Sequence, residues 1–249
     1  MAAPHIELDS PGAIDGRHIR ALAFHDVRVE YVKSVLARAR LDGGRALVVG
    51  SGRGMLAVAL ADLGFEVTAV DPSPAATAMA RDDDGGRGIT YLTAPAEDPG
   101  LPDAAFDLVY CADTFEVTSR LDLVLGHAAR LLAPGGVLVY DTVNRTLMSR
   151  LVYLGAFQGI GMTRIMPRGR YTAARLRPPA ELAAEMRRHG LRNADVCDFK
   201  PRDPRNLVKA VLARRKGRIT DDEIPPLVDF VLDPRGKPVV TYLGYATKG

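Results

Sequence analysis

Short apolar runs alternate with helix-forming stretches between residues 45 and 141. ALVV, FEVTAV and FDLVYC are continuous apolar runs of the kind found in strands that are buried on both faces of a sheet. Stretches of helical character separate them, among them MLAVALADLG, SPAATAMAR and RLDLVLGHAARLL. The alternation predicts an α/β fold, with a mostly parallel sheet covered by helices on both faces.

The remaining pattern divides the chain into parts of one domain spanning residues 1–249. A helical spacing of apolar residues begins at Val27, and the core spans 20–142. Residues 143–177 break the alternation with an amphipathic, arginine-bearing insert, which we interpret as a lid. In 178–249 we expect the helix PPAELAAEMRRHG and two closing strands, near 195–199 and 238–246.

Composition narrows the class of protein without naming its chemistry. The chain has 249 residues, of which 47% are hydrophobic and 25% charged, as in ordinary globular proteins. The two cysteines, Cys111 and Cys197, have no metal-ligand spacing and favour a reducing, cytoplasmic location. No signal peptide or long apolar run is evident, and a net charge of +3 gives no reason to expect a nucleic-acid partner. The oligomeric state cannot be read from these features.

Basic residues are concentrated in two segments. Residues 145–177 contain seven arginines and no acidic residue, and a second basic stretch runs from Lys200 to Arg218. One interpretation is a pair of solvated surfaces. The other is contact with an anionic substrate or a membrane surface, which would make the protein peripheral to a membrane through 145–177.

A glycine-rich turn between the first strand and the first helix of the core points to a nucleotide-type cofactor. In GSGRG, Gly50, Gly52 and Gly54 let a ligand approach the backbone, and the helix start offers free N–H groups. Asp71 ends the second strand, 21 residues after Gly50, where a carboxylate can accept hydrogen bonds from ribose hydroxyls. Sites for dinucleotides and for S-adenosylmethionine (SAM) share this pattern, but the spacing is G-x-G-x-G, not G-x-G-x-x-G.

The order of GSGRG, the loop APAEDPGLPDAAFDLVYC and the turn in LLAPGGVLVYDT resembles the class I SAM-dependent methyltransferases. FHDVRVEYV, YDTVNRTLMSRL and MPRGRY resemble, more specifically, the UbiG-type O-methyltransferases of ubiquinone biosynthesis. The resemblance covers about residues 20–200. It implies a Rossmann-like class I methyltransferase fold with a seven-stranded, mostly parallel sheet and an insert after the fifth strand. It also implies O-methylation of a phenolic or quinone-precursor small molecule with SAM as cofactor.

The same resemblance implies roles for individual residues. Arg28 would reach the SAM carboxylate, although by itself it reads equally as a surface arginine of a helix. Gly50 would lie under the methionine part, Asp71 would hold the ribose, and Glu97 or its neighbour Ala96 would flank the adenine. The full set of expected cofactor-binding residues is Arg28, Gly50, Ser51, Gly52, Gly54, Asp71, Pro72, Ala96, Glu97 and Ala112.

Three positions depart from the family pattern. Val48 stands where the first block usually has an acid, and Val117 stands where a histidine follows two acids after the fourth strand. The acids themselves remain as Asp113 and Glu116, which we predict to be catalytic or to bind Mg²⁺; the alternative is that they stabilise the start of the next helix. Tyr171 replaces a further family histidine.

A phenol has a pKa near 10 and needs help to lose its proton at pH 7. Three explanations for loss of the phenol proton remain open. A metal at Asp113 and Glu116 could acidify the acceptor, one of those acids could act as base, or the acceptor could be acidic enough to need no base. His25 is a further catalytic candidate because it precedes Arg28 on the cofactor side. The lost histidines leave two other functions open, a natural-product O-, N- or C-methyltransferase and a SAM-binding protein that has lost or changed its activity.

Overall fold

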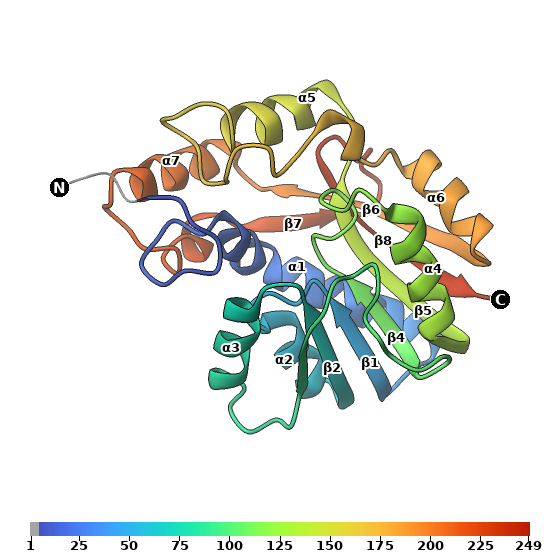
Figure 1. Ribbon diagram of the computed structural model, residues 1–249. Coiled ribbons are helices and arrows are strands. Elements are labelled where there is room, and N and C mark those ends of the chain that lie inside the picture. The colour runs from blue at the N-terminus through green and yellow to red at the C-terminus, as the bar shows by residue number, and fades with distance from the viewer. Residues whose placement is uncertain (1–4) are drawn as a thin grey trace.

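An eight-stranded sheet forms the centre of the computed structural model, which describes residues 5–249 (Figure 1). The strand order is β3-β2-β1-β4-β5-β8-β6-β7. The strands are β1 (Gly44–Val49), β2 (Phe65–Asp71), β3 (Thr90–Thr93), β4 (Phe106–Cys111), β5 (Leu132–Val143), β6 (Leu191–Pro201), β7 (Phe230–Asp233) and β8 (Thr241–Lys248).

The sheet changes direction once it passes β5. Strands β3, β2, β1, β4 and β5 are parallel, whereas β8 pairs antiparallel with β5 and with β6. The predicted class is confirmed, with one strand more than the seven expected. The additional strand is β7, which pairs antiparallel with the end of β6. Its four residues follow a proline-containing loop and are too few to give a pattern of period two.

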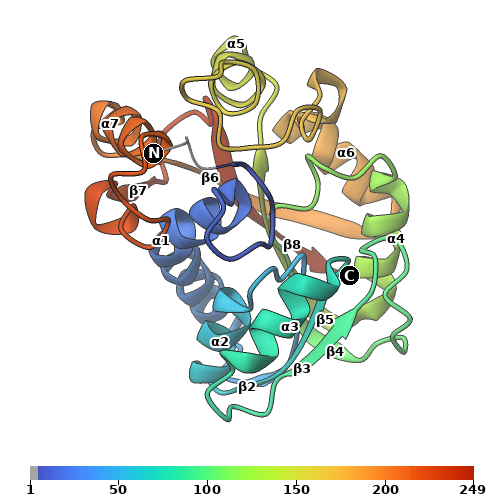
Figure 2. The same ribbon diagram turned by 60° about the vertical axis from the view of Figure 1, so that its left-hand side comes forward.

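Helices cover both faces of the sheet (Figures 1 and 2). Ala46 and Val48 of β1 pack in one core with α1 and α2, whereas Leu47 and Val49 pack in a second core with α4 and α6. This alternation follows from the period of two along a strand. The helices are α1 (Gly16–Ala39), α2 (Met55–Asp62), α3 (Pro74–Asp82), α4 (Leu121–Leu131), α5 (Leu147–Ser149), α6 (Pro179–Arg188) and α7 (Pro204–Arg215).

Helix α1 begins eleven residues before the point that apolar spacing indicates, at Gly16 instead of Val27. Asp15 caps it, because its carboxylate accepts hydrogen bonds from the backbone N–H groups of Arg17 and His18. The first turns carry buried polar residues such as Arg20, which hide the amphipathic pattern. This polar part of α1 faces the candidate site.

The insert after β5 forms a third apolar core away from the glycine turn. Tyr153, Phe157 and Tyr171 of the insert pack with Ile19 of α1 and Val211 of α7. Besides α5, the insert has a π-helix at Arg150–Ala156 and a 3₁₀ turn at Ala173–Arg175. In Figure 1, α5 and α7 lie on the side of the molecule away from β1 and β2. Within residues 5–249, no helix combines the length and the apolar character needed to cross a membrane.

Candidate functional site

The turn between β1 and α2 requires glycine. The φ angles of Gly50, Gly52 and Gly54 are 74°, 55° and 83°, in the left-handed region that side chains disfavour. A Cβ on Gly50 would collide with the carbonyl oxygen of Ala112, at the end of β4. On Gly52, the nearest atoms to a Cβ belong to the guanidinium of Arg17, at 3.7 Å. The turn thus lies against the end of β4 on one side and against α1 on the other.

Asp71 is fully buried at the end of β2 and is tied to the glycine turn. Its Oδ2 accepts the backbone N–H of Gly52 at 2.9 Å, and its Oδ1 accepts that of Ser73 at 2.9 Å. The guanidinium of Arg17 also donates to both oxygens, with Nη1 3.0 Å from Oδ1 and Nη2 on Oδ2. Burial lowers the pKa of Arg17, but the hydrogen bonds and charge of Asp71 outweigh this and hold that pKa above its ordinary value.

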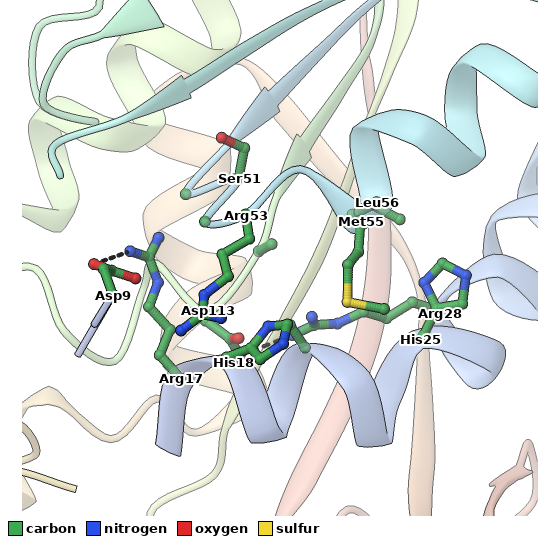
Figure 3. A pocket seen from close by; sticks show the side chains of 14 residues that line it. Asp9, Arg17, His18, His25, Arg28, Ser51, Arg53, Met55, Leu56 and Asp113 are labelled. Carbon is green, nitrogen blue, oxygen red and sulfur yellow. Dashed lines mark hydrogen bonds and ion pairs between the residues drawn. The ribbon is translucent and has the colours of Figure 1, made fainter. Parts of the chain in front are cut away.

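Two cavities adjoin this pair. Figure 3 shows the first cavity, which lies between α1 and the glycine turn with the start of α2. Helix α1 contributes His18, His25 and Arg28, and the opposite side contributes Ser51 and Met55. The second, of about 250 Å³, lies towards the ends of β2, β3 and β4. Its lining includes the predicted residues Pro72, Ala96 and Glu97 together with Val117, Thr118 and Arg170. Arg17, Gly50 and Asp113 line both cavities.

The first cavity contains polar atoms without partners. Ser51 Oγ and Arg28 Nε are buried, and neither has a hydrogen-bond partner among the described residues. Unpaired buried polar atoms are costly unless a ligand or water satisfies them. Together with the glycine turn and Asp71, they fit a polar, nucleoside-bearing ligand such as SAM.

A buried ion cluster lies beneath the first cavity. Arg28 Nη2 is 2.8 Å from Asp113 Oδ1 and 2.7 Å from Asp141 Oδ2. Arg20 Nη2 is 2.7 Å from the same Asp113 oxygen and 3.0 Å from Glu116 Oε1. Two guanidinium groups therefore hold three acidic side chains in a site with almost no exposure to water. Such a cluster is strongly destabilised when one member is removed.

Neutral side chains complete the hydrogen bonding of the cluster. The Tyr110 hydroxyl donates to Asp141 at 3.1 Å, and the Thr142 hydroxyl donates to Glu116 at 2.9 Å. Arg20 Nη1 donates to the Tyr171 hydroxyl at 2.7 Å. Burial raises the pKa of Asp113, but Arg20 and Arg28 outweigh burial and hold that pKa well below its ordinary range. Asp113 is therefore an ionised partner of two arginines.

Val48 now has a structural explanation. It is fully buried in the core beneath α1 and α2, in register with Tyr110 of β4. The carboxylates that face Arg28 come instead from Asp113, after β4, and from Asp141 in β5. The acidic side chains that face Arg28 thus lie after β4 and in β5, and β1 contributes none.

The residues around Asp113 do not fit Mg²⁺. Among residues 5–249, no group of three or more His, Cys, Asp or Glu side chains is arranged to hold a metal ion. Both predicted ligands bind Arg20, and Glu116 is fully buried and lines neither cavity beside the turn. The suggestion that these acids support the next helix is also unsupported, because α4 begins after Arg120 without a side-chain cap.

Of the predicted catalytic residues, Asp113 and His25 line the first cavity. Burial lowers the pKa of His25, Asp26 opposes this, and Arg28 lowers it further, so the net pKa lies below its ordinary value. Val117 lines the second cavity, whereas Tyr171 is buried against Arg20.

Sequence reasoning missed Arg17, Arg20 and Asp141. For Arg20 a usable signal was its position among the apolar residues of IRALAF near the start of α1, whereas Arg17, which precedes this run, carried no comparable signal. Asp141 carried the weaker signal of an acid inside the apolar run VLVYDT.

Comparison with known proteins identifies the family. Residues 47–140 match the family described as "Methyltransferase domain". The ubiquinone biosynthesis O-methyltransferase of Xanthomonas euvesicatoria pv. vesicatoria (strain 85-10) is 35% identical over 186 residues, or 73% of this chain and 75% of that protein. The chain belongs to the SAM-dependent methyltransferases. The predicted likeness to the ubiquinone biosynthesis enzymes is confirmed at the same time.

Solved structures confirm the predicted fold of this methyltransferase. A SAM-dependent methyltransferase from Thermotoga maritima, described as a possible histamine N-methyltransferase, superposes with a TM-score of 0.61 at 22% identity. That alignment covers 93% of this chain and 92% of the other. The magnesium protoporphyrin IX methyltransferase of Synechocystis PCC 6803, with bound S-adenosylhomocysteine (SAH), gives a TM-score of 0.59 at 18% identity, covering 94% and 86%.

Proposed function

We propose that this methyltransferase transfers the methyl group of SAM to an oxygen of a phenolic or quinone-precursor small molecule. The observation that carries the cofactor site is the pair of unpartnered buried atoms, Ser51 Oγ and Arg28 Nε, beside a turn that only glycine can form. The family supports an oxygen acceptor, since its relatives are named O-methyltransferases.

The residues that would hold SAM lie at the ends of three strands. Asp71 would accept the ribose hydroxyls, while Pro72, Ala96 and Glu97 would enclose the adenine in the second cavity. Ser51 and Arg28 would bind the methionine part in the first cavity. SAM supplies a methyl group on a positively charged sulfonium, and the protein's task is to align the acceptor oxygen with it.

The acceptor proton requires a base, and His25 is the candidate that the structure favours. A lowered pKa keeps its imidazole neutral at pH 7, so a ring nitrogen can accept the proton of a phenol. Asp113 is a poor base because two arginines stabilise its ionised form. We therefore assign no metal to the reaction and place the proton on His25, unless the acceptor is already ionised at pH 7.

An apolar cavity of about 530 Å³ supports a hydrophobic acceptor. It lies on the far side of α1 from the first cavity, where Ile19 and Phe24 meet Met148 and Val152 of the insert, Phe199 of β6 and other side chains. Arg20 lines this cavity while it binds Asp113, which lines the cofactor side. Arg20 thus connects the wall of the apolar cavity to the candidate site.

The insert 143–177 is proposed as the lid and as the surface for peripheral membrane contact. Leu147, Leu151 and Met162 are 75%, 58% and 72% exposed, which is unusual for large apolar residues. Arginines of the same segment would add attraction to anionic lipid. In the competing interpretation the insert is a lid over a water-soluble acceptor. A natural-product O-, N- or C-methyltransferase would have such an acceptor.

The test measures binding first and turnover second. Calorimetric titration with SAH should give binding to the wild type and none to Asp71→Ala, with folding checked by circular dichroism. Phenols and catechols, with and without a prenyl chain, are then offered with labelled SAM. Methylation of a prenylated acceptor supports the proposal, and methylation of only soluble acceptors favours the natural-product alternative. SAH binding without transfer to any acceptor would indicate a SAM-binding protein of changed activity.

A further inference from the structure

Arg17 occupies the acceptor atoms that a ribose would use. Each oxygen of Asp71 receives one donor from the backbone, Gly52 or Ser73, and one from the Arg17 guanidinium. A carboxylate offers about four lone-pair sites in all, so this set of donors saturates it. Two hydroxyl groups of a ribose can bind Asp71 only after the two guanidinium donors have left.

The same side chain obstructs the space between the two cavities. Arg17 lines both of them, and its guanidinium covers the open face of Gly52. With Arg17 in place the first cavity has a volume of about 30 Å³. That is room for roughly one water molecule, whereas small-molecule sites usually span about 300–1,000 Å³. The part of the candidate site beside the glycine turn is therefore nearly filled, and Arg17 is among the side chains that fill it.

We propose that Arg17 is an autoinhibitory occupant of the ribose position, which the cofactor displaces when it binds. The proposal rests on the proposed function, because it takes Asp71 as the ribose-binding residue. The hydroxyl donors of the cofactor replace the guanidinium donors on the same oxygens, so the hydrogen bonds of Asp71 are conserved while its ion pair is broken. Cofactor affinity is then reduced by the strength of that ion pair.

A second carboxylate is available to the displaced side chain. Asp9 Oδ2 is 3.4 Å from Arg17 Nη1 and belongs to the segment that precedes α1. Asp9 can therefore retain Arg17 when the cofactor takes Asp71, and the guanidinium need not be left without a counter-charge. The two carboxylates make a two-position switch for one arginine.

The backbone around Arg17 is anchored, which restricts the change to its side chain. Asp15 caps α1 and receives Arg53 of the glycine turn at 2.8 Å. The Asp15 backbone N–H donates to Asp221, which is held in turn by Arg214. The start of α1 is thus tied both to the glycine turn and to the segment after α7.

The experiment is an SAH titration of the wild-type chain and four variants. Arg17→Met keeps the aliphatic stem but removes the charge, and should bind SAH more tightly by on the order of tenfold, the effect of losing a competing charge-assisted hydrogen bond. Asp9→Asn should bind SAH more weakly, because displaced Arg17 loses its second partner. The double variant should bind like Arg17→Met alone. Arg38→Met, at the exposed end of α1, should match the wild type.

The outcomes distinguish failure of this inference from failure of the cofactor assignment. Tighter binding by Arg17→Met, including binding that appears only in that variant, supports both. Equal or weaker binding by a folded Arg17→Met overturns the inference, since Arg17 would then be a bystander or a ligand of the cofactor, while the cofactor site stands. No SAH binding by any folded variant overturns the cofactor assignment and the inference together. Thermal unfolding of each variant establishes that it is folded.

Discussion

Asp141 should make the stability of this protein fall as the pH rises from about 4 to 7. Burial raises its pKa, Arg28 opposes this, and the charges of Asp113 and Glu116 add to the rise, so that the pKa reaches about 7. In an unfolded chain the pKa of an aspartate lies near 3.9. Between these two values the folded protein holds a proton that the unfolded chain has released.

Asp141→Asn isolates this effect. The amide resembles the protonated acid in shape and keeps an oxygen for the Tyr110 hydroxyl, which donates to Asp141 Oδ1. Because the folded state binds the additional proton, raising the pH favours unfolding of the wild type by up to about 1.4 kcal/mol per pH unit. Over about three units the wild type should lose at most ~4 kcal/mol relative to the variant, and the difference should level off above pH 7.

Urea unfolding followed by circular dichroism, at intervals from pH 4.5 to 8, measures this difference directly. The variant Asp42→Asn is the control, because it removes an exposed carboxylate outside the cluster and should follow the wild type. A constant difference between Asp141→Asn and wild type, or a wild type that gains stability relative to the variant with rising pH, would refute the reasoning. In that case Arg28 outweighs burial, and Asp141 is ionised throughout.

Three further predictions concern the cluster, the turn and the base. Arg20→Ala removes the guanidinium that pairs with Glu116 and one of the two that pair with Asp113, and should cost about 3–5 kcal/mol in urea unfolding. Arg38→Ala breaks an exposed pair and should cost less than about 1 kcal/mol. Gly50→Ala places a methyl group against the Ala112 carbonyl and should abolish SAH binding by calorimetry, while Gly43→Ala, before β1, should retain it. His25→Gln should lower kcat for a phenolic acceptor and remove the fall in rate that protonation of the imidazole causes in the wild type at acidic pH. An unchanged pH profile would exclude His25 as the base.

The parallel half of the fold could be predicted from sequence because local patterns and tertiary demands agree there. A strand covered on both faces must be apolar throughout, and a turn with three left-handed φ angles must contain glycine. For this reason ALVV, GSGRG and Asp71 indicated β1, the turn and the end of β2 at their observed positions. The short strand β7 and the basic helix α7 gave no such signal. Pairing with β6 fixes the position of β7, and packing against the insert fixes that of α7.

Sequence reasoning named Asp113 and Arg28 as site residues but did not predict that they form an ion pair. Asp113 was expected to act as a base or a metal ligand, and Arg28 was expected to bind the cofactor. Arg28 and Asp113 are 85 residues apart in the sequence, and they meet because α1 crosses over the ends of β4 and β5. Sequence spacing does not encode such a distance, and a carboxylate beside two arginines has a different chemistry from a carboxylate beside a histidine.

The position of β8 imposes an order on the synthesis and folding of the chain. This strand comprises residues 241–248, yet it lies between β5 and β6 and joins the two through antiparallel pairing on both sides. While a ribosome still holds residues 241–248, β6 and β7 have no route into the sheet, and the edge of β5 is left unpaired. Such an edge can pair with another chain. Completion of the sheet therefore waits until residues 241–248 have left the ribosome, and only then can β6 and β7 join the parallel strands.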